Sequence, residues 1–263
     1  MRRSYSAGEA RPGLPAVRIG ACRSRAAGAG LAVLAALVLS GCGGAARSQP
    51  PTGATATTTA IETPPVSLWI GDSYTVGAGA TSSATGEALA TSAALGWQTD
   101  LDAEGGTGFV AAGHAVSPGN EPVPDRLPSD ARRFRNPSPG VVVLDAGRND
   151  RGIPMRVVRP AVLLSLRELR RAFPSAAVVV IAPFLMRSKP TDYAALRRLL
   201  EREARRYGWA FVDPIAEGWI GRASAKLVAP DGVHPDQAGY DYLVAHLAPA
   251  IEHALAAAHE TVR

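Results

Sequence analysis

The sequence contains little cysteine, with only Cys22 and Cys42 among its 263 residues. Two cysteines exclude a disulfide framework of the kind that holds small secreted domains together. The five histidines show no metal-ligand spacing, and neither a paired-cysteine motif nor a His-Glu-x-x-His motif occurs. We therefore expect no metal site and no cofactor, and a fold that is held by its apolar core.

The sequence also lacks an apolar run of the roughly 20 residues that a membrane-spanning helix requires. Its longest apolar stretch runs from Ala26 to Leu39. The formal net charge of +5 comes entirely from residues 1–42, which hold six arginines and one acidic residue. Subtracting these from the 28 basic and 23 acidic residues leaves 22 of each. A neutral remainder argues against a nucleic-acid partner.

The first 41 residues have the features of an export signal. An arginine-bearing leader precedes the apolar stretch, and small residues follow it. The segment Leu39-Ser40-Gly41-Cys42 resembles a bacterial lipobox, whose cysteine is acylated, becomes the mature N-terminus and anchors the protein to the outer face of a membrane. The alternative is an ordinary signal peptide with a chance cysteine near its cleavage site. The lipobox interpretation predicts an extracytoplasmic protein that is anchored to the cell membrane by lipidated Cys42.

Residues 42–65 are rich in Gly, Ala, Ser, Thr and Pro and too poor in large apolar side chains to form a core, so we expect a tether. Residues 66–263 are enough for one domain with a substantial core. Short β-branched runs alternate there with longer segments of helical spacing, which predicts a parallel sheet with helices on both faces. The expected strands are Val66–Ile70, Thr99–Ala103, Val141–Leu144, Val178–Ile181 and Ala210–Val212, and the expected helices are Val157–Ala172, Tyr193–Tyr207 and Gln237–Ala258.

Four short polar motifs follow predicted strands or lie on the last long connection. They are Gly71-Asp72-Ser73, Gly105-Gly106-Thr107, Gly147-Arg148-Asn149-Asp150 and Asp231-Gly232-Val233-His234. The carboxyl ends of parallel strands share one edge of a sheet, so we expect these motifs to meet.

The first and last motifs together predict a catalytic triad. Ser73 on a strand-to-helix turn can act as a nucleophile, and His234 can take its proton and return it to a leaving alcohol. Asp231, three residues earlier, can orient the imidazole. Taken singly, each residue has an ordinary explanation as a helix N-cap, a loop histidine or an Asp-Gly turn. Their joint occurrence favours catalysis.

In this order, the four motifs resemble those of the SGNH or GDSL hydrolases. The resemblance implies a three-layer α/β/α sandwich with a parallel five-stranded, flavodoxin-like sheet, and esterase activity without a metal or cofactor. It also implies an oxyanion hole formed by the amide of Ser73, a glycine amide and the side chain of Asn149. The glycine two residues before the threonine is Gly105, and Gly106 is the alternative. Tyr74 stands where the family name has leucine.

Residues next to the motifs have less defined roles. Asp72 and Asp150 are expected to form turn hydrogen bonds and anchor loops. Asp145 requires a partner, because it lies in an apolar strand. Arg148 is expected either to touch substrate or to be solvated.

Residues 108–139 show no clear core pattern and are expected to form a long loop that shapes the substrate pocket. Aromatic residues elsewhere are candidates for the same pocket, although a core position is the favoured interpretation for each. They are Trp97, Phe109, Phe184 and Trp219.

These expectations combine into a membrane-tethered serine esterase that acts through an acyl-serine intermediate. Its expected substrates are O-acetyl or other O-acyl groups on carbohydrate, or small acyl esters. Two alternatives keep the same fold: a non-catalytic glycan- or envelope-binding lipoprotein, and an O-acyltransferase that passes the acyl group to a sugar hydroxyl. We expect membrane contact through the lipid anchor only.

Overall fold

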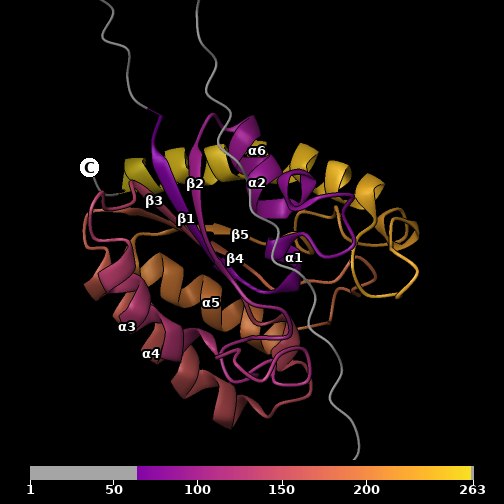
Figure 1. Ribbon diagram of the computed structural model, residues 1–263, viewed down its shortest axis with the longest axis horizontal. Helices are drawn as coiled ribbons and strands as arrows, with labels where there is room; N and C mark the ends of the chain where they lie inside the picture. Colours follow the sequence, from indigo (N-terminus) through magenta and orange to yellow (C-terminus); the bar gives the residue numbers. More distant parts are fainter. Residues whose placement is uncertain (1–63, 262–263) are drawn as a thin grey trace, which may run out of the picture. The chain divides into compact units, whose positions relative to one another are not determined.

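A computed structural model describes residues 64–261 and contains a five-stranded parallel sheet between two layers of helices (Figure 1). The strands follow the order β2-β1-β3-β4-β5 and comprise β1 (Val66–Gly71), β2 (Gln98–Ala103), β3 (Val141–Asp145), β4 (Ala177–Ile181) and β5 (Ala210–Val212). The helices are α1 (Ser73–Val76), α2 (Glu87–Ala94), α3 (Val123–Arg133), α4 (Met155–Ala172), α5 (Ala194–Tyr207) and α6 (Gln237–Thr261). The predicted signal peptide, Cys42 and nearly all of the predicted tether lie outside the described residues.

The central strands are buried on both faces, as their continuous apolar sequences predict. In β1, Leu68 and Ile70 point into the core beneath α3, α4 and α5, whereas Trp69 points into the core beneath α2 and α6. In β3, Val142 and Val143 divide in the same way. Figure 1 shows the two helical layers on opposite sides of the sheet. Burying each such side chain contributes about 1.5–3 kcal/mol, which makes this sheet the rigid base of the site.

All five predicted strands and all three predicted helices are present, so the predicted fold class is confirmed. Helix α4 begins two residues earlier than predicted, and α6 ends three residues later. The prediction that residues 108–139 form one loop is wrong, because α3 lies within them. Two of the inward positions of α3 hold Arg126 and Asp130, whose polarity conceals the helical apolar spacing.

All strands run in the same direction, so the sheet has one edge of carboxyl ends and an opposite edge where the strands begin. Helix α1 follows β1 at the carboxyl edge, and a 3-10 turn at Arg148–Asp150 follows β3 there. By contrast, α3, α4 and α5 each end at the opposite edge, because each leads into the start of the next strand. The two edges therefore carry different sets of residues.

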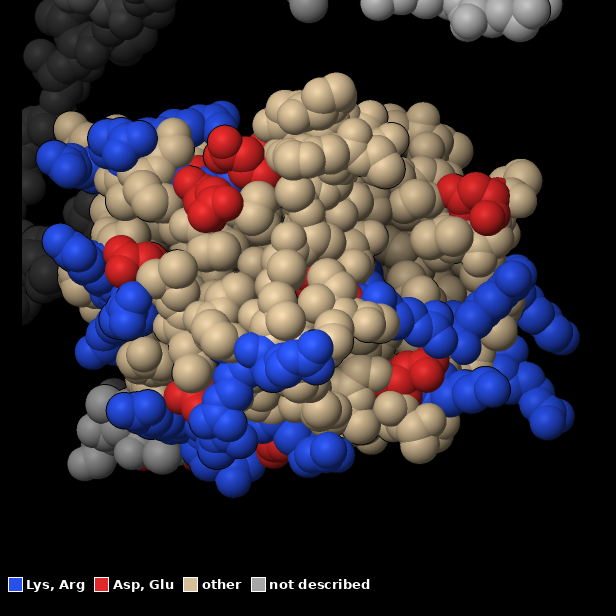
Figure 2. Space-filling view, turned by 90° about the horizontal axis from the view of Figure 1, so that it is seen from below, with Lys and Arg blue, Asp and Glu red and all other residues tan. Residues whose placement is uncertain are grey.

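Charge is distributed unevenly over the domain. Seven of the 28 basic residues and two of the 23 acidic residues precede residue 64, which leaves 21 of each. Figure 2, seen from below, nevertheless shows more Lys and Arg than Asp and Glu around the margins of this face. No helix among residues 64–261 combines the length and apolar character that crossing a membrane requires.

Candidate active site

Ser73 is the first residue of α1 and follows a tight turn at the end of β1. Asp72 caps the helix, since its carboxylate accepts a hydrogen bond from the amide of Tyr74 at 3.0 Å. Gly71 is required because a Cβ at this position would collide with the Thr75 side chain and lie 2.9 Å from the carbonyl oxygen of Asp145. This turn fixes the Ser73 hydroxyl at the carboxyl edge of the sheet.

His234 and Asp231 lie on the connection before α6 and reach Ser73 from the far end of the sequence. Nε2 of His234 is 2.8 Å from Oγ of Ser73, and Nδ1 is 2.6 Å from Oδ2 of Asp231. The hydrogen bond from His234, followed by that from the Val233 amide, lowers the pKa of Asp231 to about 2. The three residues predicted to form a triad therefore lie in one chain of hydrogen bonds that ends in a charged carboxylate.

Tyr74 fastens this connection to α1. Its hydroxyl donates a hydrogen bond to the carbonyl of Val233 at 2.7 Å, and its ring centroid lies 5.8 Å from that of His234. Gly79 allows a close approach on another side, because a Cβ there would collide with the carbonyl oxygen of Pro235 and lie 3.2 Å from Cβ of His234. The tyrosine that replaces the leucine of the motif thus positions the histidine loop.

Gly105 lies beside Ser73. A Cβ on either Gly105 or Gly106 would lie close to Val116, but only one on Gly105 would also approach Ser73, at 3.9 Å from its Cβ. In the described part of the chain, the amides of Ser73 and Gly105 donate to no protein acceptor. Both remain available to an oxygen atom that enters the site, and this proximity favours Gly105 over Gly106.

Asn149 lies on the 3-10 turn after β3 and points toward the same space. Its side-chain amide donates to the carbonyl of Thr107 at 2.9 Å. The same nitrogen is 3.3 Å from Oδ2 of Asp72, a longer hydrogen bond. These contacts connect the three motifs at the carboxyl edge.

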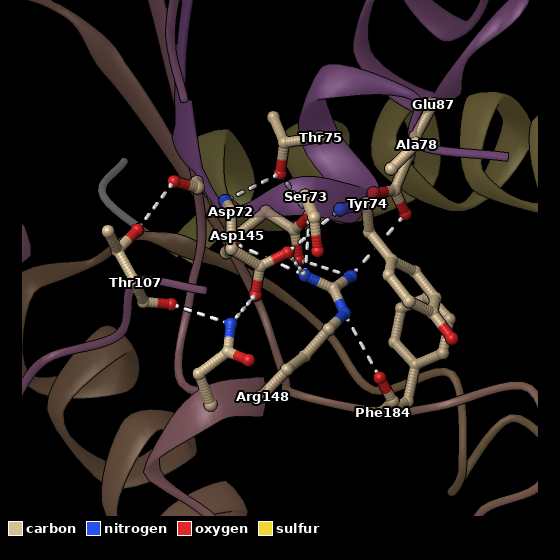
Figure 3. A network of polar contacts seen from close by, with 12 residues as sticks. Asp72, Ser73, Tyr74, Thr75, Ala78, Glu87, Thr107, Asp145, Arg148 and Phe184 are labelled. Atoms are coloured by element: carbon tan, nitrogen blue, oxygen red, sulfur yellow. Dashed lines mark hydrogen bonds and ion pairs between the residues drawn. The ribbon is translucent and has the colours of Figure 1, made fainter. Parts of the chain in front are cut away.

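Arg148 is buried beneath the site with a side chain only 2% exposed, so the expectation that it is solvated is wrong. It contributes to the lining of the hollow above Ser73, and its contact with substrate stays a prediction. Its guanidinium lies 2.8 Å from Asp145, 3.3 Å from Asp72 and 3.5 Å from Glu87. Figure 3 shows the guanidinium at the centre of this network, below Ser73. Arg148 is thus the partner that the buried carboxylate of Asp145 requires.

Three carboxylates surround this single guanidinium. Burial disfavours the charged form of a carboxylate and so raises its pKa. Burial, partly offset by Arg148, raises the pKa of Asp72 to about 6. Burial also raises the pKa of Glu87 well above its ordinary range. Burial therefore disfavours the charged form of Glu87 beside the other two carboxylates.

Asp150 anchors the segment that follows β2. Its carboxylate accepts hydrogen bonds from three successive backbone amides at 2.7, 2.9 and 2.9 Å, which belong to Phe109, Val110 and Ala111. The predicted loop-anchoring role of Asp150 is confirmed.

A hollow of about 480 Å³ opens above Ser73 and His234. Apolar side chains from four separate segments form much of its wall: Val76, Ala78, Val116, Leu185 and Val233. Val116 comes from the 108–139 segment, which therefore contributes to the hollow as predicted. Of the four aromatic candidates, none lines it; Phe109, Phe184 and Trp219 are buried, and Trp97 packs against the core beneath α6.

Tyr193 lines both this hollow and a second one of about 200 Å³, as does Arg151. Its hydroxyl donates to the carbonyl of Arg148 at 3.1 Å, and its backbone has a φ of 54°, an unfavourable value for a bulky residue. The sequence did not indicate that Tyr193 lies at the site, because it was predicted only as the first residue of the helix Tyr193–Tyr207. No group of three or more His, Cys, Asp or Glu within residues 64–261 is arranged to hold a metal ion.

Comparison with known proteins agrees with this geometry. The model of the GDSL-like lipase/acylhydrolase family matches residues 69–242, a span that contains all four motifs. The chain belongs to this family. A GDSL lipase of Mycobacterium tuberculosis is 34% identical over 192 residues, which cover 69% of this chain and 79% of that lipase. This member is accordingly an SGNH-type serine hydrolase that acts on esters.

Solved structures share the fold of this GDSL hydrolase at low sequence identity. A family two carbohydrate esterase from Clostridium thermocellum, in complex with cellohexaose, is 22% identical with a TM-score of 0.58, over 74% of this chain and 66% of that one. The psychrotrophic esterase EstA from Pseudoalteromonas sp. is 13% identical with a TM-score of 0.54, over 72% of this chain and 97% of that one.

Proposed function

We propose that this GDSL hydrolase is an extracytoplasmic esterase, tethered by lipidated Cys42, that cleaves acyl esters through an acyl intermediate on Ser73. The observation that carries the catalytic assignment is the unbroken chain from Ser73 Oγ through His234 to Asp231, at 2.8 and 2.6 Å. Both distances lie within hydrogen-bond reach for proton transfer.

Each proton in this mechanism has a donor and an acceptor. Nε2 of His234 removes the proton of Ser73 as Oγ attacks the ester carbonyl carbon. The imidazolium then protonates the leaving alcohol as its bond to the carbonyl carbon breaks. Water, activated by the same nitrogen, releases the acid and restores Ser73. Because the pKa of Asp231 is lowered to about 2, its carboxylate stays charged and stabilises the imidazolium throughout.

The oxyanion of the tetrahedral intermediate would be met by the amides of Ser73 and Gly105 and by the side chain of Asn149. The two amides have no competing protein acceptor among the described residues. The 3.3 Å contact of Asn149 with Asp72 is the longer of its two bonds and is the one that an oxyanion would replace. Donors of this kind each contribute about 10²–10³ in rate.

The substrate would present a short acyl chain to the apolar wall of the hollow and its alcohol to the open side. A volume of about 480 Å³ accommodates such a chain together with part of a sugar. The likeness to carbohydrate esterases, together with the predicted envelope location, favours O-acyl groups on carbohydrate. Small acyl esters fit the same wall and serve as assay substrates.

The test is hydrolysis of p-nitrophenyl acetate and butyrate by the chain from residue 42 onward with Cys42→Ala. We expect the Ser73→Ala variant to lose about 10³-fold or more in kcat/KM. Ser83→Ala is the matched control, because the Ser83 side chain is exposed and takes no part in the hydrogen bonds that join Ser73, His234 and Asp231. Equal rates in the parent and the Ser73→Ala variant would contradict the assignment.

A further inference from the structure

Three helices on one side of the sheet each end in a pair of arginines. The last turns of α3, α4 and α5 contain Arg132–Arg133, Arg170–Arg171 and Arg205–Arg206. Each helix leads by a short connection into the next parallel strand, so the three pairs lie at the edge where the strands begin. Ser73 lies at the opposite edge, after the end of β1.

Five arginines at this edge form no salt bridge within residues 64–261, although the charge of Arg133 acts on Asp130 of the same helix. Arg205 and Arg206 pair with glutamates of their own helix at 2.8 and 3.5 Å. No such pair exists within residues 64–261 for Arg132, Arg133, Arg135, Arg170 and Arg171, which are exposed. We call these five residues the arginine edge. A helix C-terminus favours a cation in its last turn, but this does not account for Arg135, which lies beyond α3.

Two residues of the arginine edge lie beside a hollow in the protein surface. Arg135 and Arg171 line a hollow of about 420 Å³ between α3 and α4, whose apolar side chains include Leu127 and Ala131. Glu168 also lines it and lies 3.6 Å from Arg167. Two guanidinium groups beside an apolar floor suit a phosphate group that is attached to an acyl chain.

The chain enters the domain at this same edge. The carbonyl of Val66, the first residue of β1, accepts a hydrogen bond at 2.9 Å from the amide of Gly140, which ends the connection that carries Arg135. Cys42 precedes Pro64 by 22 positions, a length of chain that can span at most about 75 Å. An anchor with that reach does not determine which side of the domain faces the membrane.

We propose that the arginine edge docks on an anionic phospholipid surface and thereby turns Ser73 away from the bilayer. The inference rests on the anchored location in the proposed function. It adds a second membrane contact to the lipid anchor, which the sequence had predicted to be the sole contact. Arginines near an anionic leaflet are attracted to it, and five of them act together. In this orientation the substrate of Ser73 lies in the aqueous envelope, as a carbohydrate ester would.

The first test is vesicle binding by the chain from residue 42 with Cys42→Ala, which keeps the whole described domain. We expect cosedimentation with 1:1 phosphatidylglycerol–phosphatidylcholine vesicles at low salt, and none with pure phosphatidylcholine. Replacing all five arginines of the arginine edge by glutamine should weaken partitioning at least tenfold.

The matched control removes five other exposed positive charges, through Arg187→Gln, Lys189→Gln, Arg198→Gln, Arg222→Gln and Lys226→Gln. This control variant should bind as the parent does. Equal loss in both variants, no binding by the parent, or stronger binding to soluble dextran sulfate than to vesicles would overturn the proposal.

The second test measures orientation. The chain from residue 42 with Cys42→Ala contains no cysteine, so a single dye can be attached at one chosen site. Ser138→Cys marks the arginine edge, and Ser83→Cys marks the catalytic edge; both serines are exposed. On anionic vesicles, nitroxide-labelled lipid should quench the dye at residue 138 and not that at residue 83. Equal or reversed quenching would overturn the proposal.

These outcomes remain separate from the ester assignment. Both glutamine variants should retain hydrolysis of p-nitrophenyl acetate, which also shows that they fold. Loss of vesicle binding with full hydrolysis supports the arginine edge. Ser73-dependent hydrolysis by a parent that ignores anionic vesicles refutes the docking proposal and leaves the esterase intact. Docking without hydrolysis refutes the esterase and leaves the docking proposal intact.

Discussion

Tyr74 and Arg148 support the catalytic residues from beneath. Tyr74 donates a hydrogen bond to the carbonyl of Val233. Arg148 donates hydrogen bonds to Asp72, which caps α1, and to Asp145, which ends β3. The two side chains also contact each other, with the guanidinium carbon 4.5 Å from the tyrosine ring centroid. A leucine at position 74 could neither donate to the carbonyl of Val233 nor offer an aromatic ring to the guanidinium. Tyr74 and the buried Arg148 therefore act together.

In the proposed mechanism, the carboxylate of Asp231 stays charged throughout and transfers no proton. Asp231→Asn keeps the shape of the side chain but removes the charge that stabilises the His234 imidazolium. We expect kcat for p-nitrophenyl acetate to fall by about 10²–10⁴ with little change in KM. Asp236→Asn on the same connection is the control and should retain activity. Steady-state kinetics of both variants checks the prediction, and a similar kcat in all three proteins would refute it.

Tyr193 is expected to limit the length of the acyl chain. Tyr193→Ala would join the hollow above Ser73 to the adjoining one of about 200 Å³, which Ile153, Met155 and Leu196 help to line. The ratio of kcat/KM for p-nitrophenyl octanoate to that for butyrate should rise at least about tenfold, since each methylene buried contributes roughly 0.8 kcal/mol. Tyr193→Phe keeps the ring and should keep the parent ratio. An unchanged ratio in the alanine variant would assign Tyr193 a structural role alone.

Helix α3 shows why part of the fold could not be predicted. The sequence Val123–Arg133 contains two prolines after its first position, and its inward face includes Arg126 and Asp130. Arg126 is buried against Asp102 at 3.1 Å, a contact that only the folded chain brings together. The predicted helices α4 and α5 present mainly apolar residues at their inward positions, with Ser165 and Glu203 as exceptions, so their helical spacing was visible.

Asp130 on α3 should make stability depend on pH. Burial, followed by its hydrogen bond with Asp102, raises the pKa of Asp130 to about 8. The unfolded value is near 3.9, so the folded chain binds more protons between these limits. Stability therefore falls as pH rises from about 4 to about 8.

Asp130→Asn removes this proton and preserves the size of the side chain. We expect the fall in Tm between pH 5 and pH 8 to shrink by about 3 °C or more, the shift that roughly 1 kcal/mol causes in a domain of this size. Asp125→Asn, at an exposed site on the same helix, should keep the parent dependence. Thermal melts at both pH values decide the matter, and parallel curves for parent and Asp130→Asn would contradict the expectation.

The molecule as a whole has a catalytic edge and an arginine edge on opposite ends of one parallel sheet. Alternating apolar runs and helical segments were enough to predict that sheet, and four motifs were enough to predict which residues meet at its carboxyl edge. Arg148 could not be assigned from sequence, because its three acidic neighbours come from the N-cap of α1, from α2 and from β3. Arg148 occupies a variable position of its motif, and the sequence around it does not indicate that distant carboxylates will surround it.

Removal of the proposed lipid anchor should separate the two modes of membrane contact. In cells, the parent is expected to stay in the membrane fraction through a wash with about 0.5 M NaCl, because acyl chains resist salt. Cys42→Ala should be released by that wash, since charge attraction is screened at high salt. Cys22→Ala is the matched control and should behave as the parent. Salt-resistant retention of Cys42→Ala would exclude lipidation at this position.

The hydrogen bond between Ser73 and His234 spans 161 positions of the sequence. The first 160 residues of the domain contain all five strands and all but one of the α-helices, yet such a fragment holds a serine without a base. Activity therefore begins only when the last segment has folded back over the first helix. In the exported protein that we propose, esterase turnover would report on completed folding, and a chain still in passage across the membrane would be unable to cleave esters.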